Sequence, residues 1–479
     1  MTIDLRSEQF RAAVRDIQRR AERQLLDERL VRCFVPNRVL EELDSTSNQL
    51  LFGRRGVGKT HTLKVFASEH VLGGELTAYL DCTSFGSGLG IDGSDKNVGI
   101  RFFSTLLRSL AHSLLEHASR REPPVGEADN EILVALADIE KASEAKANGA
   151  TFDYLGIQRF INKFLDLIGA TRVTILLDEW AQVPRRAQPF FAEFIKRTFF
   201  ANPRVAMKIG VVDFTYRLDG EYQGSRIGLE RSADIFSDIQ MDRYFVWDQD
   251  TRFVERFFAE VLYNHLAVEL NLSLDGSTEQ KYQFVLNNLF TQERAFVEMC
   301  RAAEGNARDM LVLFVKAHGR FCQQQSHQRI GLDEVHDSST ELYRGDKYSN
   351  IATEKHLEEF LEYLVTSVIK EKKSRTFMVP FQQRNHPLLQ RLYSARILHL
   401  LNYEWSHPDR PGERYSLVTM DNGTYVSFRG TKNEPDQQVF WADEETPPPD
   451  LVPFDDRRSI RRIIVSEDAL EKFWNRQEN

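Results

Sequence analysis

The sequence predicts an α/β fold in which a parallel sheet is flanked by helices and is followed by an all-helical region and a small C-terminal domain of helices and strands. Up to about residue 212, short apolar segments alternate with amphipathic ones, which is typical of a parallel sheet covered on both faces. From about residue 250 this alternation stops, and apolar residues recur at helical spacing. Near the C-terminal end, helical spacing gives way to two alternating segments, which predict a hairpin.

The first half of the chain supplies the predicted sheet. Residues 5–33 carry apolar positions at helical spacing among many arginines and predict an N-terminal helix. Asn48–Phe52 is short, apolar and followed by a glycine loop, so it predicts a buried strand. The remaining elements are a helix at 60–69, a strand at 76–80, a helix at 100–120, a polar insertion at 122–150, a strand at 173–177, a helix near 187–200 and a strand at 205–212.

The second half is predicted to be mainly helical. Helices are expected throughout 250–335 and again before the C-terminal hairpin. Asp421-Asn-Gly lies between the alternating segments 415–419 and 424–428, and it is a strong hairpin signal because Asn and Gly tolerate the positive φ of a tight turn. Residues 434–456 are acidic and proline-rich, and they predict a linker.

Composition limits the class of protein. A chain of 479 residues is expected to form about two to four domains. Its 62 Lys and Arg against 71 Asp and Glu exclude a protein that is basic throughout, although a local basic face remains compatible. The four cysteines show no C-x-x-C spacing, which argues against a zinc ribbon and favours a reducing compartment. The charged N-terminus is unlike a signal peptide, and no apolar run is long enough to cross a membrane. These features predict a soluble, cytoplasmic protein.

The segment Gly53-Arg-Arg-Gly-Val-Gly-Lys-Thr60 has the spacing G-x-x-x-x-G-K-[ST] of a phosphate-binding loop. Small residues let successive backbone N–H groups turn inward around a phosphate, and the following helix directs its positive dipole end to the same phosphate. Lys59 is expected to reach the β- and γ-phosphates, and the Thr60 hydroxyl is expected to hold Mg²⁺. The predicted nucleotide-binding residues of this segment are Gly53, Arg54, Arg55, Gly56, Val57, Gly58, Lys59, Thr60 and His61.

The segment Val173-Thr-Ile-Leu-Leu-Asp-Glu179 is a predicted buried strand that ends in two carboxylates. Many strands end in acidic residues, but after a phosphate-binding loop this pattern is specific. Asp178 is expected beside the Mg²⁺ shell, and Glu179 is expected beside the attacking water. A Glu directly after the Asp indicates hydrolysis rather than a slow timing switch. The sequence has no N-K-x-D guanine-reading motif, so ATP is favoured over GTP.

Together with Glu304-Gly-Asn-Ala-Arg-Asp309, which opens a predicted helix, these motifs resemble those of AAA+ ATPases. The closest resemblance is to the initiator-like group related to the origin-recognition complex, in its bacterial form. It covers roughly residues 30–430 and implies a homo-oligomer or a partner protein, and for bacterial members a mobile-element or phage-defence setting. The implied domains are an N-terminal helix (1–33), an ATPase core (34–248), a helical lid (249–345), a winged-helix-like domain (350–432) and an acidic linker with a tail (433–479).

The resemblance also implies roles for residues outside the two nucleotide motifs. In that group, a G-[DN]-x-R motif in the lid carries the "sensor 2" arginine, which falls here on Arg308. Arg308 is then expected to touch the γ-phosphate during catalysis, whereas a solvated residue at a helix start is the alternative. The adenine is expected to lie against Phe34, Val35 and Pro36.

Two further roles stay open. The strand at 205–212 runs into Asp213, where the group has a polar "sensor 1" residue. A carboxylate cannot donate to a phosphate oxygen unless it is protonated, so Thr215 competes for this role, and a structural turn is the other explanation of Asp213. An arginine finger that acts across a subunit interface is expected between this strand and the lid. The candidates are Arg226, Arg231 and Arg243, with Arg231 preferred, and ordinary surface charge is the alternative for each.

The charge balance reverses between residues 367 and 432, where eleven basic residues stand against five acidic ones. A helix predicted at 386–401 and a following hairpin resemble a winged helix. Basic side chains on such a domain would neutralise the phosphates of double-stranded DNA and give salt-dependent binding that is largely independent of sequence. A small packing domain with a solvated basic face is the alternative. The predicted DNA contacts are Arg391, Arg396, Lys372 and Lys373.

Two classes of function follow from these patterns. In the first, an ATP-hydrolysing AAA+ ATPase assembles in response to nucleotide and acts on DNA or is loaded onto it. In the second, a signal-sensing NTPase switch binds a protein partner and no DNA. The basic C-terminal segment favours the first class, and the net charge of −9 favours the second. No membrane partner is expected in either class.

Overall fold

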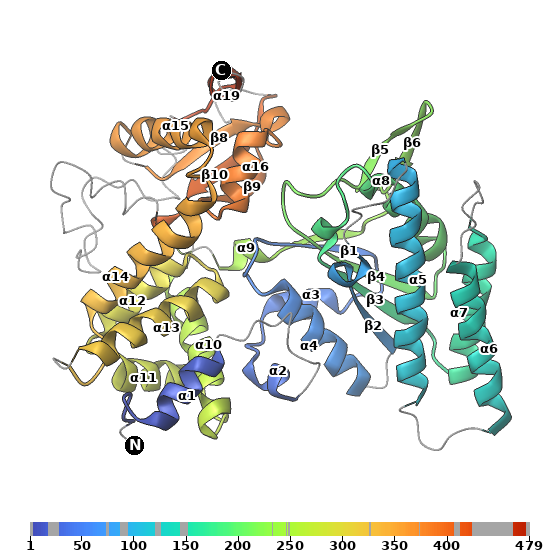
Figure 1. Cartoon of the computed structure of the whole chain (residues 1–479), viewed down its shortest axis with the longest axis horizontal. Coiled ribbons are helices and arrows are strands. Elements are labelled where there is room, and N and C mark those ends of the chain that lie inside the picture. Colours follow the sequence, from blue (N-terminus) through green and yellow to red (C-terminus); the bar gives the residue numbers. More distant parts are fainter. Residues whose placement is uncertain are drawn as a thin grey trace. The chain divides into compact units, whose positions relative to one another are not determined.

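The computed structural model describes residues 3–17, 28–72, 76–86, 94–119, 126–143, 152–231, 233–245, 247, 250–324, 327–372, 374–406, 412–423 and 463–475. The chain forms two compact units (Figure 1). One, which we name the sheet unit, comprises Ala21–Gly53 and Lys59–Met241. The other, the helical unit, comprises Met1–Arg20, Arg54–Gly58 and Asp242–Asn479. The middle of the phosphate loop therefore belongs with the second half of the chain.

The sheet unit contains the predicted parallel sheet, with strand order β2-β3-β4-β1-β7. The register places Asp81 beside Asp178 and Phe52 beside both Val211 and Gln240, so the carboxyl ends of the strands lie along one edge. The inner strands are buried throughout, as expected for continuous apolar runs in a parallel sheet. The strands are β1 (Gln49–Phe52), β2 (Leu76–Asp81), β3 (Val173–Asp178), β4 (Val205–Val211) and β7 (Ser237–Gln240).

Helices flank this sheet, and α5 to α8 share one apolar core with it. Helix α5 packs against β2 and α8, and α6 packs against both α5 and α7. The polar insertion predicted at 122–150 contains helix α6, whose Ile132, Ala135, Leu136 and Ile139 form a buried stripe at helical spacing. The helices are α2 (Glu28–Cys33), α3 (Arg38–Leu43), α4 (Lys59–Leu72), α5 (Asp95–Ser119), α6 (Gly126–Ser143), α7 (Tyr154–Ile168) and α8 (Gln188–Ile195).

The helical unit begins with α1 (Glu8–Ile17), which buries Phe10, Val14 and Ile17 against α10 and α13. The helix predicted over 5–33 is therefore two helices in the described residues, because α1 belongs to this unit and α2 to the sheet unit. The following helices confirm the predicted helical region and enclose one apolar core. They are α9 (Met241–Tyr244), α10 (Thr251–Leu270), α11 (Thr278–Leu289), α12 (Glu293–Ala303), α13 (Ala307–Gln323) and α14 (Leu332–Leu342).

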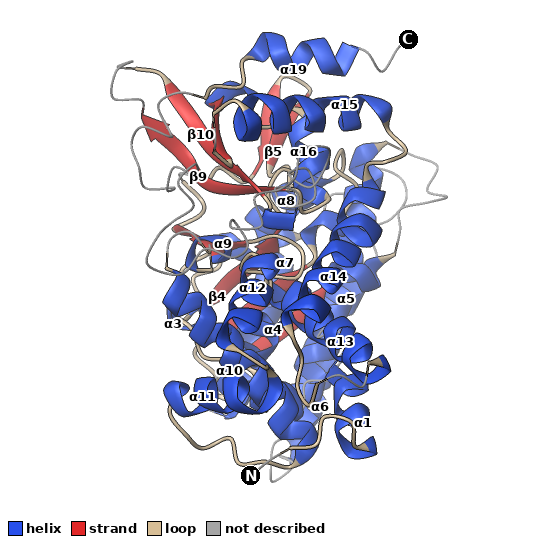
Figure 2. Ribbon diagram, turned by 90° about the vertical axis from the view of Figure 1, so that its left-hand side faces the viewer, coloured by secondary structure: helices blue, strands red, loops and turns tan. Residues whose placement is uncertain are grey.

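The C-terminal part of the helical unit combines helices with a three-stranded antiparallel sheet of order β8-β10-β9. Figure 2 shows this sheet together with α15 and α19. The rings of Phe473 and Trp474 on α19 contact Phe360 of α15 and His386 before α16. The elements are α15 (Lys355–Leu364), β8 (Thr376–Pro380), α16 (Pro387–Ser394), β9 (Leu398–Ser406), β10 (Arg414–Met420) and α19 (Glu467–Trp474).

The hairpin turn predicted at Asp421-Asn-Gly is wrong. β10 pairs with β9, so the two strands of the hairpin precede Asp421. The Asp421 carboxylate accepts the Gly423 N–H at 2.8 Å and closes a local turn at the end of β10. Asx turns and hairpin turns share the same residue types, which explains the error. The second predicted strand, 424–428, lies outside the described residues.

The helix predicted at 386–401 is too long. α16 ends at Ser394, and Leu398 already begins β9. Arg396 between them has φ 62, a left-handed value that breaks the helix. Its guanidinium binds Asp309 and Asp346. The helix therefore ends before Arg396, whose side chain binds carboxylates that are distant in the sequence.

Several short strands were not predicted, namely β7, β8 and the two strands of a small hairpin. β5 (Asp219–Tyr222) and β6 (Ser225–Gly228) form a hairpin whose turn residues Gln223 and Gly224 both have positive φ. The two strands are short and polar, so they have no apolar periodicity to signal them. Among the described residues, no helix combines the length and the apolarity needed to cross a membrane. All four cysteines lie in the described part of the chain, and none forms a disulfide.

Candidate functional site

The phosphate loop joins β1 to α4 and needs glycine at two positions. Gly56 and Gly58 have φ 91 and 113, left-handed values that glycine adopts readily and other residues only with strain. Space is a second constraint at Gly56, where a Cβ would lie 2.6 Å from Asn306 Oδ1 and 2.9 Å from Arg308 Cβ. Successive inward-turned amides of this kind can bind an anion, and the α4 N-terminus adds its dipole.

Lys59 and Thr60 form the first turn of α4. The Lys59 ammonium is buried and donates to the carbonyl of Gly53 at 2.6 Å. The Thr60 hydroxyl hydrogen-bonds with the carboxylate of Asp178, and the charge of Lys59 acts on the same carboxylate. The structure thus brings together the phosphate-binding lysine and both Mg²⁺ ligands predicted from the sequence.

Asp178 stands at the end of β3 with no exposed surface. Its Oδ1 accepts the Glu179 N–H at 2.8 Å. Burial raises the pKa of this carboxyl, although Thr60, Lys59 and the Glu179 amide all act to lower it. A buried carboxylate gains from a nearby cation, and a carboxylate with a hydroxyl is a set of hard oxygen donors suited to Mg²⁺. The residues present therefore fit a magnesium ion.

Glu179 leaves the strand in a left-handed conformation, with φ 54 and ψ 43. Such values are uncommon for a residue with a side chain, and residues like this cluster at functional sites. The turn is anchored by Trp180, which is fully buried and contacts Phe191 with ring centroids 5.2 Å apart. Glu179 itself is half-buried directly beside Asp178, as its expected role requires.

Sequence reasoning missed Tyr79 on β2. Its hydroxyl donates to Asp178 Oδ2 at 3.1 Å. Burial, followed by the charge of Asp178, raises the Tyr79 pKa strongly, so the hydroxyl keeps its proton and remains a donor. Gly210 on β4 closes the other side, because a Cβ there would lie 2.7 Å from Asp178 Oδ1. The only signal in the sequence was that β2 and β3 both end in aspartate, which places them at the same edge.

The segment expected to hold the adenine lies near the start of α4. The Phe34 ring meets the His61 ring edge-on, with centroids 5.2 Å apart. The His61 imidazole also bonds the carbonyl of Leu30 at 2.8 Å, and burial lowers its pKa. His61 therefore ties α4 to the segment before β1, where Val35 is buried and Pro36 is exposed.

The candidates for sensor 1 and the arginine finger differ in their surroundings. Asp213 is buried after β4, while the Thr215 hydroxyl donates to the carbonyl of Val212 at 2.9 Å. Arg231 pairs with Asp238 and donates to the Tyr216 hydroxyl.

Arg226 and Arg243 are both exposed. Arg226 pairs with Asp219 at 2.8 Å within the β5–β6 hairpin. Arg226 and Arg231 are therefore both paired inside their own unit, and the side chain of Arg226 is the more exposed, at 62% against 33%.

The start of α13 contacts the phosphate loop within the helical unit. Asn306 caps α13 by accepting the Asp309 N–H at 3.1 Å. Its Nδ2 donates to the carbonyl of Arg55 at 2.8 Å, and the Arg308 N–H donates to the carbonyl of Gly56 at 3.1 Å. Arg308 is thus fixed next to the loop through its backbone.

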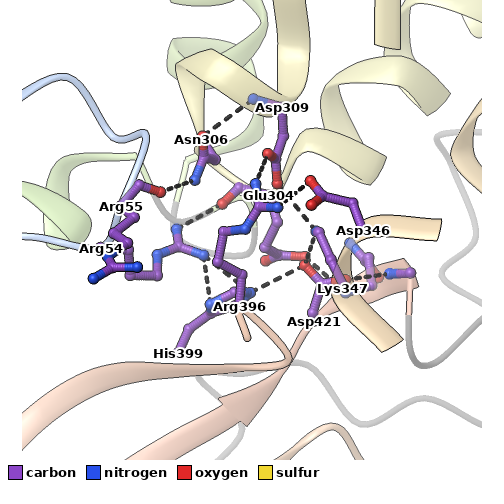
Figure 3. A network of polar contacts seen from close by, with 12 residues as sticks. Arg54, Arg55, Glu304, Asn306, Asp309, Asp346, Lys347, Arg396, His399 and Asp421 are labelled. Atoms are coloured by element: carbon purple, nitrogen blue, oxygen red, sulfur yellow. Dashed lines mark hydrogen bonds and ion pairs between the residues drawn. The ribbon is translucent and has the colours of Figure 1, made fainter. Parts of the chain in front are cut away.

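The prediction that Arg54 binds the nucleotide needs a correction for its side chain, which is only 2% exposed. Its Nε and its backbone N–H donate to the two oxygens of Asp242 at 2.8 and 2.9 Å. A terminal nitrogen donates to the carbonyl of Glu304 at 2.8 Å, and the other contacts the His399 ring (Figure 3). The guanidinium is therefore an internal anchor, whereas the Arg55 side chain is exposed.

These contacts belong to a larger set of buried ion pairs that we name the Arg54 network. Lys347 binds Asp421 at 2.8 Å and Asp309 at 3.2 Å. Arg375 binds Glu304 at 2.9 Å, and His399 lies 3.2 Å from Asp421. The network comprises Arg54, Asp242, Glu304, Asp309, Lys347, Arg375, Arg396, His399 and Asp421.

Three residues of the network have the composition of a metal site. Ligand atoms of Glu304, His399 and Asp421 all lie within 4.8 Å of one another. Each already faces a cation, however, because Arg375 binds Glu304, Arg54 contacts His399 and Lys347 binds Asp421. A divalent ion would meet three positive charges, so this cluster is an ion-pair network and not a metal centre.

The predicted DNA contacts are not equivalent. Arg391 is 54% exposed and pairs with Glu354, and Lys372 is exposed. Lys373 lies outside the described residues. Arg396 was wrongly placed on the helix, and its side chain is 11% exposed between Asp309 and Asp346. An arginine already neutralised in this way is not a candidate for a phosphate contact.

No known protein family matches the chain, and no curated protein matches it. Among solved structures, the chain is similar to the ORC1 protein of Aeropyrum pernix in complex with DNA. The two share 13% sequence identity with a TM-score of 0.35, over 84% of this chain and 96% of the archaeal one. The function proposed below therefore rests on the residues of this chain.

We expect Tyr79→Phe to weaken Mg²⁺ binding about tenfold or more, because partners that orient a metal ligand commonly contribute that much. Nucleotide binding in the presence of EDTA should be unchanged, since Tyr79 contacts Asp178 and not the phosphate loop. Titrating Mg²⁺ against a fluorescent ATP analogue measures both. Tyr154→Phe, on α7, is the matched control. Equal Mg²⁺ dependence in the parent and Tyr79→Phe would contradict the role of the hydroxyl.

Acid should destabilise the helical unit through His399. Burial, followed by the charge of Arg54, lowers its pKa to about 3, while Asp421 and Lys347 also face the ring. The unfolded chain takes up this proton below about pH 6.5 and the folded chain does not, so stability falls as pH drops from about 6.5 toward 3.

The Asp421 pKa is lowered by Lys347 and then His399, against the effect of burial. Its contribution is present above about pH 3.9 and is lost only below it, so of these two residues only His399 contributes to the pH dependence between about pH 6 and 4.5. In urea unfolding over this window, His399→Gln should reduce the slope of stability against pH by about one proton. An unchanged slope would show that His399 is not held neutral.

Proposed function

We propose that this protein is a Mg²⁺-dependent ATPase of the AAA+ type, whose nucleotide-driven assembly acts on DNA or is loaded onto it. The observation that carries the ATPase part is the meeting of Lys59, Thr60 and Asp178 at the carboxyl edge of a parallel sheet. Ligands commonly bind at this edge of open α/β sheets.

Each residue at this edge has a distinct role in the proposal. Lys59 neutralises phosphate charge, and Thr60 with Asp178 holds the magnesium ion. The ion supplies charge stabilisation for phosphoryl transfer when it is bound. Glu179 orients the attacking water and accepts its proton, a role that its left-handed turn beside Asp178 supports. Arg308, held at Gly56 by its backbone, supplies positive charge to the γ-phosphate.

The nucleotide is ATP rather than GTP in this proposal. Phe34 and His61 provide aromatic surface beside the start of α4, which suits a purine ring. The sequence has no N-K-x-D motif to read guanine. Assembly of several protomers would let Arg226 or Arg243, both exposed, reach the nucleotide of a neighbour.

The DNA part of the proposal rests on the C-terminal strands and helices. Helix α16 follows β8 and is followed by the β9–β10 hairpin, an order that supports a winged-helix-like domain. In the part of this domain that the structure describes, the exposed basic residues are Lys355, Lys370, Lys372, Arg391 and Arg414. A domain of this kind would contact backbone phosphates, and several copies held together by nucleotide would bind more tightly than one. A mobile-element or phage-defence setting rests on the sequence resemblance alone.

One observation favours the second candidate, a nucleotide switch that binds a protein. Arg375 and Arg396 contribute to the excess of basic residues in the C-terminal segment, but both form ion pairs with carboxylates of the same unit. The exposed basic charge available for DNA is therefore smaller than the sequence indicated.

The ATPase proposal is tested with two variants. Lys59→Ala should abolish nucleotide binding, because the ammonium acts on the phosphates of the bound ground state. Glu179→Gln should bind ATP as the parent does and lose turnover by about a hundredfold or more, since it acts on the water only during hydrolysis. ATP affinity and phosphate release are measured for both. Turnover at the parental rate in Glu179→Gln would remove Glu179 from the mechanism.

The DNA proposal is tested with the double variant Arg391→Glu, Lys372→Glu in filter binding with ATP at several salt concentrations. If both residues contact phosphates, binding should weaken strongly and the salt slope should fall by about two units. The control Arg15→Glu, Arg256→Glu changes the net charge equally, at an exposed residue of α1 and a half-buried residue of α10. Parental binding in the test variant, or no binding by the parent at low salt, favours the protein-binding switch.

A further inference from the structure

The middle of the phosphate loop is held by contacts with the helical unit. The backbone N–H of Arg54 donates to Asp242, and the carbonyls of Arg55 and Gly56 accept from Asn306 and Arg308. These bonds hold three of the four peptide groups between Gly53 and Val57. The amides that would surround a phosphate follow directly in the chain, so their orientation depends on these contacts.

The Arg54 side chain extends this dependence to the C-terminal domain. Besides Asp242, its guanidinium reaches the carbonyl of Glu304 and the ring of His399 on β9 (Figure 3). Tyr393 on α16 adds a hydroxyl that lies 3.3 Å from the same Asp242 carboxylate. Residues from two elements of the C-terminal domain thus contact either Arg54 or its counter-ion.

The imidazole of His399 can accept a hydrogen bond on one side and donate one on the other. A neutral imidazole can accept from Arg54 at Nδ1 and donate from Nε2 to Asp421, which lies 3.2 Å away. Asp421 in turn binds Lys347 at 2.8 Å. His399 therefore connects Asp421, at the end of β10, to the guanidinium of Arg54.

The charges of the network are equal in number and largely buried, and the more exposed Asp346 also pairs with Arg396. Four cations, Arg54, Lys347, Arg375 and Arg396, stand against the four carboxylates Asp242, Glu304, Asp309 and Asp421. Removing one partner leaves a buried charge without its counter-ion, which is strongly unfavourable. The loop and the C-terminal strands consequently cannot change position independently while the network is intact.

We propose that residues of the C-terminal domain, chiefly His399, are positioning residues for the nucleotide site and set the conformation of the phosphate loop through Arg54. This inference rests on the proposed function of the loop. Because coupling between two sites is reciprocal, nucleotide binding must in turn stabilise the C-terminal sheet. Whatever binds the C-terminal domain is thereby linked to the nucleotide state.

A double-mutant cycle on nucleotide affinity tests the proposal. In the full chain, His399→Ala should weaken binding of a fluorescent ATP analogue by about tenfold, the effect of losing one hydrogen bond to a charged group. The same substitution in an Arg54→Met background should have little further effect, because the link it breaks is already absent. His399→Gln, which keeps a donor and an acceptor, should restore most of the affinity. Additive effects of the two substitutions would overturn the proposal.

Amide hydrogen exchange provides a readout that a purely structural role would not move. In the parent, the ATP analogue should slow exchange in β8, β9 and β10, and in His399→Ala this protection should disappear while the protection of α4 remains. Nucleotide protection of the sheet that survives in His399→Ala would contradict the inference. Where His399→Ala does not fold at the assay temperature, Asp421→Asn takes its place and is expected to give the same loss of coupling.

The outcome also separates this inference from the proposed function. If the parent binds the analogue no better than Lys59→Ala does, the nucleotide site itself is refuted. If the parent binds it and Lys59→Ala does not, the site stands, and the His399 and Arg54 variants decide the positioning role alone.

Discussion

The structure depends on the buried ion pair between Arg54 and Asp242. Arg54 lies in the phosphate loop, and Asp242 follows the edge strand β7 in the sequence. Both the guanidinium and the backbone N–H of Arg54 bind this one carboxylate, so the pair fixes the loop's main chain as well as its side chain. Breaking a buried pair commonly costs about 3–5 kcal/mol, a large share of the stability of a domain. Such a contact specifies one arrangement of the loop.

A buried charge with polar partners also defines the carboxyl edge of the sheet. Asp178 is fully buried, and its charge is compensated by the Thr60 and Tyr79 hydroxyls, the Lys59 ammonium and the Glu179 amide. These partners come from three different elements, so the carboxylate is oriented before any ligand arrives. A magnesium ion that meets a preorganised oxygen donor loses less free energy in ordering its ligands. In the proposed function, this geometry would contribute to catalysis by positioning, which is the main contribution of proteins to phosphoryl transfer.

Local patterns predicted the sheet, the helical region and the phosphate loop, because buried parallel strands and glycine loops leave strong signals in the sequence. Contacts between distant segments left none. The helix containing Arg396 was predicted to be too long. Arg396 binds Asp309, which is far away in the sequence, and local spacing cannot reveal such a contact. Arg54 was predicted to bind the nucleotide because it lies within the phosphate-loop motif. That motif specifies the backbone of the loop but not the side chain at this position, which can be of any type. Tyr79 was missed because its partner Asp178 becomes adjacent only through strand pairing.

The central claim is that Thr60 and Asp178 hold the magnesium of a bound nucleotide. Manganese can replace magnesium and gives an electron paramagnetic resonance signal that reports its ligands. With a non-hydrolysable ATP analogue, the parent should bind one manganese ion showing ³¹P hyperfine coupling, and Asp178→Asn should bind it at least about tenfold more weakly. Tight manganese binding with unchanged phosphorus coupling in Asp178→Asn would contradict the account.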